Sequence, residues 1–73
     1  MHPSAISLIA LRRELAARYA RLNRLWVTAR NGYRRLNEAA VPNLNALREA
    51  GKRLDELERG RMALRRDLKA LSD

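Results

Sequence analysis

Cysteine is absent from this chain of 73 residues, phenylalanine is absent too, and histidine occurs once, as His2. Without cysteine there can be no disulfide framework, and a lone histidine near the start argues against a structural zinc site. A chain this short also buries only a small share of its surface, so a single core is marginally stable. We therefore expect no metal and no cofactor, and we predict that stability comes from homodimerisation.

Catalytic and membrane signals are also scarce. The apolar opening SAISLIAL (4–11) is too short to cross a bilayer, and no basic segment precedes it as in a signal peptide, which predicts a cytoplasmic protein. The sequence has no Ser/His/Asp set, no metal-ligand cluster and no glycine-rich phosphate loop. We expect neither an enzyme nor a small-molecule substrate.

Positive charge is abundant. Sixteen Lys and Arg stand against eight Asp and Glu, for a net charge of +8. Residues 1–41 carry +6, with Glu14 and Glu38 their only acids, whereas residues 42–73 carry +2. Such an excess favours a polyanionic partner, namely nucleic acid, an anionic membrane surface or an acidic protein. Most of the basic residues are arginine, which suits bidentate phosphate contacts but is also the bias of a GC-rich genome.

Apolar residues recur with a helical period in both halves of the chain. The first stripe comprises Leu8, Leu15, Leu22, Ala29 and Leu36, beside Tyr19, Trp26 and Tyr33. The second comprises Leu47, Leu54 and Leu68, beside Ala50, Leu57, Leu64 and Leu71. Pro42 separates the stripes, Ser4 is a candidate cap for the first helix, and Asn43 or Asn45 can cap the second. The pattern predicts a helix over about 5–40, a turn at about 41–44 and a helix over about 45–71.

Folding the two stripes together predicts an all-α antiparallel two-helix hairpin that spans one domain, residues 1–73, and dimerises into a helical bundle. Residues whose numbers sum to about 83 should then face each other, which sets the large ring of Tyr33 against Ala50 and Gly51. The three aromatic residues share the phase of the leucines, so we expect them to pack between the helices. The weak helix formers Asn31 and Gly32 leave an alternative, a break into three helices that resembles a helix-turn-helix.

Arginine also occupies the predicted seam. Arg18 and Arg61 stand where apolar residues are expected. Their charged heads must either extend into solvent, which we predict, or find a carboxylate or a ligand. Acidic residues four positions before an arginine predict three ion pairs: Glu14 with Arg18, Glu49 with Arg53, and Asp55 with Arg59.

The faces opposite the leucine stripes carry the candidate binding residues. On the first helix these are Arg13, Arg24 and Arg35, flanked by Arg21 and Arg34. On the second helix they are Arg48, Lys52, Arg59 and Arg66. Rows of arginine spaced by helical turns can track phosphates, although they are also typical of a solvated helix face.

These features predict a non-enzymatic basic binding protein, a regulator or accessory factor that docks on nucleic acid or another polyanionic surface. The alternative is a phage- or plasmid-type adaptor or inhibitor that binds an acidic protein. Its apolar anchors would come from the set Ile6, Ile9, Trp26 and Tyr33.

The stretch LIALRRELAARYARL (8–22) resembles the first helix of the all-helical chorismate mutases, with Arg12 where that family places a substrate arginine. The acidic positions that accompany this motif in the family are missing, and the chain is too short for the family's third helix. The resemblance covers fifteen residues and leaves the prediction of a binding protein unchanged.

Overall fold

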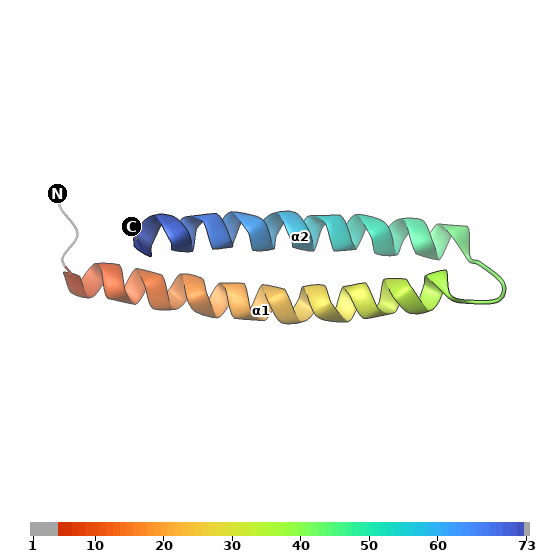
Figure 1. The fold of residues 1–73 in the computed structure, drawn as a ribbon, viewed down its shortest axis with the longest axis horizontal. Helices are drawn as coiled ribbons and strands as arrows, with labels where there is room; N and C mark the ends of the chain where they lie inside the picture. The colour runs from red at the N-terminus through yellow and green to blue at the C-terminus, as the bar shows by residue number, and fades with distance from the viewer. Residues whose placement is uncertain (1–4, 73) are drawn as a thin grey trace.

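The computed structural model describes the backbone of residues 5–72 and the side chains of residues 7–72. Two helices, α1 (Ala5–Asn37) and α2 (Leu44–Ser72), lie side by side and antiparallel, joined by one short turn (Figure 1). Residues 5–72 contain no β-strand. The predicted all-α hairpin is confirmed. The candidate N-cap Ser4 lies outside the described residues.

Helix α1 runs without a break through Asn31 and Gly32. The three-helix alternative, and with it the helix-turn-helix, is therefore wrong. A glycine inside a helix costs about 1 kcal/mol relative to alanine. That cost is offset here because Tyr33 and Leu36, which follow the glycine, are half-buried and hold the last turns of α1 to the hairpin.

The turn between the helices begins earlier than predicted. Helix α1 ends at Asn37, three residues before the expected boundary, and the amide of Ala39 already reaches back only three residues, to the carbonyl of Leu36 at 3.4 Å. Pro42 also disfavours helical geometry at the residue before it, so the helix cannot resume ahead of the proline. Asn43 caps α2, because its Oδ1 accepts a hydrogen bond from the amide of Ala46 at 3.0 Å.

The two helices meet along a narrow seam of leucine, alanine and aromatic side chains. Tyr19, Trp26 and Tyr33 are half-buried, as their phase predicts. A Cβ at Gly51 would lie 3.7 Å from Cε2 of Tyr33, so the large ring does face the smallest neighbour. Among the described residues only Leu57 is buried, with 7% of its surface exposed. A single seam between two helices cannot enclose more.

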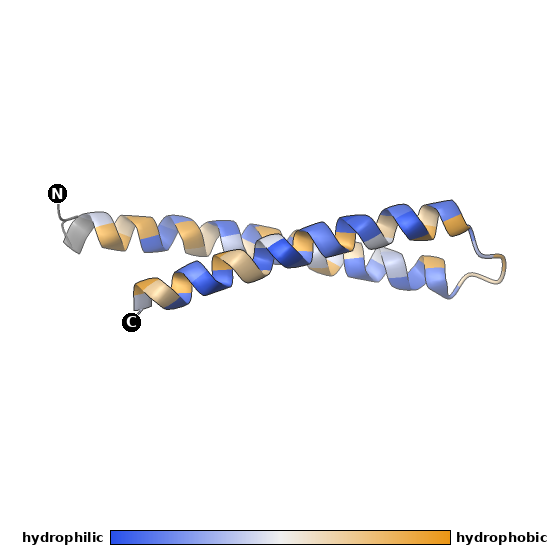
Figure 2. Cartoon of the chain, turned by 90° about the horizontal axis from the view of Figure 1, so that it is seen from above, coloured by the Kyte–Doolittle hydropathy of each residue, from blue (hydrophilic) through white to orange (hydrophobic). Residues whose placement is uncertain are grey.

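The hairpin is long and thin, 57 × 16 × 16 Å. Figure 2 shows hydrophobic residues recurring along the whole length of both helices. The accessible surface is 6123 Å², whereas a compact monomer of 8.4 kDa exposes about 4,600 Å². Much apolar surface therefore stays in contact with water.

Candidate polyanion-binding surface

The predicted binding residues of the first helix form one exposed row on α1. We call this row the α1 basic edge: Arg13, Arg21, Arg24, Arg34 and Arg35, all exposed. The row lies opposite the face that α1 turns toward α2. Its members Arg13, Arg24 and Arg35 line up because residues 11 positions apart share nearly the same direction on a helix. Arg13, Arg24 and Arg35 follow one another at about 16 Å along the helix axis, at 1.5 Å per residue.

The acidic residues near the α1 basic edge, Glu14 within α1 and Glu38 just after it, form no ion pair with its arginines among the described residues. Glu14 is the one acidic residue of α1, and its Oε1 lies 2.7 Å from Nη2 of Arg18, as predicted. Within the described part of the chain, none of the five arginines of the edge takes part in an ion pair. Their charge is therefore available to an external anion.

The second predicted row lies on α2 and is less basic. We call it the α2 basic edge: Arg48, Lys52, Arg59 and Arg66, all exposed. Nζ of Lys52 lies 3.9 Å from Oε1 of Glu49, a loose pair that replaces the predicted pairing of Glu49 with Arg53. The predicted pair of Asp55 with Arg59 is also not formed among the described residues. Five acidic residues share α2 with this row, which lowers its positive potential.

The two edges do not combine into one patch. Apart from Arg35, which also borders a groove between the helices, the residues of each row point away from the partner helix, so the rows lie along opposite long edges of the hairpin. One rigid polyanion can contact one row at a time. The nine predicted residues therefore divide into an uncompensated α1 track and a partly compensated α2 track.

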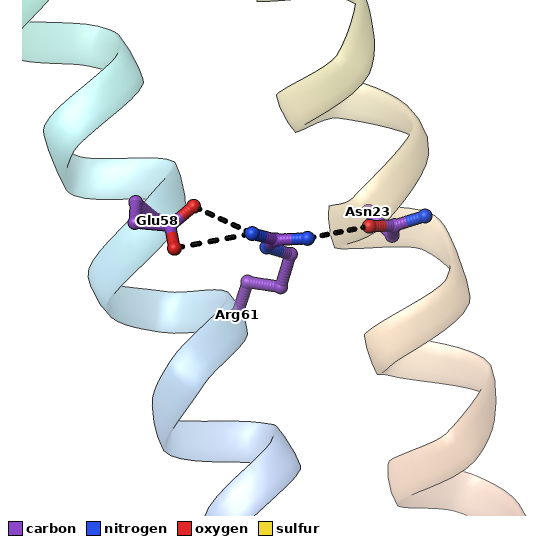
Figure 3. Close-up of polar contacts among 3 residues, drawn as sticks. All are labelled: Asn23, Glu58 and Arg61. Carbon is purple, nitrogen blue, oxygen red and sulfur yellow. Dashed lines mark hydrogen bonds and ion pairs between the residues drawn. The ribbon is translucent and has the colours of Figure 1, made fainter.

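The structure also contains a polar cluster that the sequence did not predict. The guanidinium of Arg61 turns into the seam, where Nη2 donates to both carboxylate oxygens of Glu58 at 2.8 and 3.1 Å (Figure 3). Its Nη1 donates to Oδ1 of Asn23 on the opposite helix at 3.1 Å. The expectation that Arg61 extends into solvent is wrong, because a carboxylate and an amide are within reach inside the groove. Arg18, in contrast, keeps an exposed side chain, 57% accessible.

Trp26 completes this group, which we call the Arg61 cluster: Asn23, Trp26, Glu58 and Arg61. Cζ of Arg61 lies 3.9 Å from the centre of the indole ring, and Cζ of Arg30 lies 5.0 Å from it. Both distances fall within the range of cation–π attraction. The ring thus serves contacts inside the hairpin, which supports the prediction of packing rather than base stacking. Nε of Arg61 is buried without a hydrogen-bond partner.

Three further features of the described residues bear on a substrate site, a metal site and a membrane span. Nη2 of Arg12, the substrate arginine in the mutase resemblance, donates to the carbonyl of Leu71 at 2.8 Å, near the end of α2. Residues 5–72 hold no cluster of three or more potential metal ligands. Neither of the described helices has a segment apolar enough to span a membrane.

Comparison of the chain with protein-family models, with curated proteins and with solved structures found no match.

Proposed function

We propose that this chain is a non-enzymatic, homodimeric binding protein of the cytoplasm that docks on nucleic acid through the α1 basic edge and acts as a regulator or accessory factor. One observation supports the choice of surface above the others: five exposed arginines follow one helix edge, and none of them is paired with a carboxylate in the described part of the chain. Arginine on such an edge contacts phosphate through its planar fork of donors.

The arginines of the α1 basic edge would bind phosphates and not bases. Trp26 is engaged with Arg30 and Arg61, so no aromatic platform for bases stands beside the arginines. Binding through phosphates alone is independent of sequence and releases counterions, which makes affinity fall steeply as salt rises.

Fluorescence anisotropy with a labelled 20-base-pair DNA and a labelled single-stranded RNA tests this proposal. Affinity measured between 50 and 200 mM KCl should fall with a slope of about −0.9 per phosphate contacted for the DNA and about −0.7 for the single-stranded RNA. The triple variant Arg13→Gln, Arg24→Gln, Arg34→Gln should flatten that slope by roughly 2 to 3 units. The matched α2 variant, Arg48→Gln, Arg59→Gln, Arg66→Gln, removes the same charge and should change the slope less.

Two results would contradict the proposal. Absence of binding to both probes at 50 mM KCl removes nucleic acid as the partner. An equal loss in the two triple variants means that net charge, and not the α1 basic edge, carries the interaction.

The alternative, an adaptor that binds an acidic protein, is supported by apolar side chains among the charged ones. Ile9 is 51% exposed and Met62 is 49% exposed, and Met62 lines a groove of about 450 Å³ together with Arg59 and Arg66. The side chain of Ile6 lies outside the described part. Pull-down from a lysate treated with nuclease separates the two functions, because partners of an adaptor survive the treatment. A small-molecule substrate is no part of either proposal.

A further inference from the structure

Two apolar grooves open along the same long side of the hairpin. The groove near the turn, about 500 Å³ in volume, includes Leu25, Gly32 and Arg53 in its lining. The groove near the chain ends, about 440 Å³, includes Leu11 and Asp67. Leu11, Leu25 and Gly32 are separated by multiples of seven, as are Arg53 and Asp67, so each set shares one direction on its helix. We call this surface the apolar side.

The apolar side is long and wide enough to seat a second hairpin. Leu11 is 43% exposed and Leu25 is 44% exposed. The hairpin exposes about 1,500 Å² more than a compact monomer of its mass, and a stable protein interface buries about 800 Å² on each partner. One long side of a body of 57 × 16 Å covers about 900 Å², so a single docking event on this side supplies that area.

The apolar side of one copy is complementary to the apolar side of a second copy that runs in the opposite direction. On α2 the sequence positions Arg53, Gly60 and Asp67 are evenly spaced, so a second copy turned head to tail about Gly60 sets each Arg53 against Asp67 of the other copy. Asp67 takes part in no ion pair among the described residues. The reversal therefore supplies two ion pairs that one hairpin alone does not make.

The same head-to-tail arrangement places a leucine of α1 over an open space on α1 of the other copy. It brings Leu11 of one copy over Gly32 of the other, because these positions are nearly equidistant from the level of Gly60. A Cβ placed on Gly32 would meet no atom within 4 Å, so the space above this glycine is open. Leucine knobs that enter such holes are the packing unit of helical bundles.

We propose that the apolar side binds the apolar side of a second copy, head to tail, and forms an antiparallel four-helix bundle. A turn-to-turn arrangement would instead collect Arg35 and Arg53 of both copies at one end of the interface, where like charges repel. The geometry identifies the face and the direction of the homodimer that forms part of the proposed function. It also lays α1 against α1, so the two α1 basic edges run along one edge of the bundle.

Spin labelling measures the direction of the two copies. The chain has no cysteine and Val41, in the turn, is 84% exposed, so Val41→Cys gives one label per copy away from both helices. Double electron–electron resonance should report an intermolecular distance comparable with the 57 Å length of the hairpin, and dilution with unlabelled chain should remove it. A distance below half that length means turn-to-turn packing and overturns the inference. Absence of any intermolecular distance, together with a monomer mass, also overturns it.

Substitution of Gly32 tests the face. Gly32→Glu enters open space in the single hairpin but puts a charge into the interface, so the dissociation constant of the dimer should rise at least tenfold. The control Asn31→Glu makes the same charge change one residue away, on an exposed position outside the grooves, and should alter it less than about threefold. Equal effects, with unchanged helix content by circular dichroism, contradict the assignment of the face. Neither readout needs nucleic acid, so this inference can fail while the α1 basic edge still binds, and the reverse.

Discussion

The seam between the two helices has one flank on each long side of the hairpin, and only one of the two flanks is closed by side chains. On one flank Arg61 crosses from α2 to Asn23 of α1 and is held by Glu58, so polar side chains bridge the helices (Figure 3). On the other flank glycine and leucine leave two grooves open. Asn23 and Leu25 mark the two flanks of α1, because side chains two positions apart on a helix point about 160° away from each other.

This difference shows which flank of the hairpin is closed by its own side chains. On the flank with the Arg61 cluster the guanidinium contacts a carboxylate, an amide and an aromatic face, and Nε is the one atom of the group left without a partner. The apolar side has no such closure and keeps Leu25 half-exposed in the groove with Gly32 and Leu11 half-exposed in the groove near the chain ends. One flank orients the two helices of a single chain, and the other is suited to a second chain.

The largest effect is expected in the seam that both flanks share. Leu57→Ala removes the most buried side chain of the described residues and should lower the free energy of unfolding by about 2–4 kcal/mol. Urea unfolding followed by circular dichroism measures this change. The control Leu44→Ala, at a residue 72% exposed, should change it by less than about 0.5 kcal/mol. Similar losses at both positions would show that the seam is placed wrongly.

A smaller effect is expected from the flank with the Arg61 cluster. Arg61→Ala removes the contact with Trp26 and leaves the partly buried Glu58 without its cation, at a cost of about 1–3 kcal/mol. Arg61→Leu restores an apolar residue to the heptad seam and should cost less, because well-packed apolar residues often replace buried ion pairs without loss. Thermal unfolding compares the two variants. A larger loss for leucine than for alanine contradicts this account of the cluster.

On the apolar side the expected effect falls on association. Leu25→Gln should raise the dimer dissociation constant about tenfold, equivalent to about 1.4 kcal/mol. The stability of the single hairpin should hardly change, because Leu25 is already 44% exposed. Sedimentation equilibrium gives the first quantity, and urea unfolding at concentrations below the dissociation constant gives the second. An unchanged dissociation constant would exclude Leu25 from the interface.

The smallest effect concerns salt. Two copies with a net charge of +8 each repel one another, so an increase from 50 to 300 mM KCl should tighten the dimer by a few-fold through screening. Nucleic-acid affinity should move in the opposite direction, since it depends on counterion release. If both affinities fall together with salt, the dimer depends on charge pairs and not on the apolar side.

Much of the fold could be predicted from the period of the apolar residues. The leucine stripes and Pro42 give two antiparallel helices, and the pairing of Tyr33 with Gly51 follows from their register. The end of α1 was missed by three residues, because alanine at positions 39 and 40 has a high helix propensity and only the geometry imposed by Pro42 opposes it.

The candidate site was predictable in part. Helical phase is enough to identify the exposed arginines, since an exposed face needs no partner to define it. The Arg61 cluster was missed because a seam arginine can extend outward or turn inward, and the choice depends on the space beside Trp26 and Asn23. Glu58 three positions before Arg61 was the available signal. The open space over Gly32 depends on the packing of the side chains around it, which no periodicity encodes.

The hairpin is closed on one flank by the Arg61 cluster, and its other flank is open to a second copy. Sedimentation equilibrium of the unmodified chain at 300 mM KCl, at concentrations up to 100 µM, measures whether that second copy binds. If a second copy covers the apolar side, the mass should converge on twice 8.4 kDa as concentration rises. A mass that stays at 8.4 kDa throughout would show that the apolar side remains open in solution and would contradict the account.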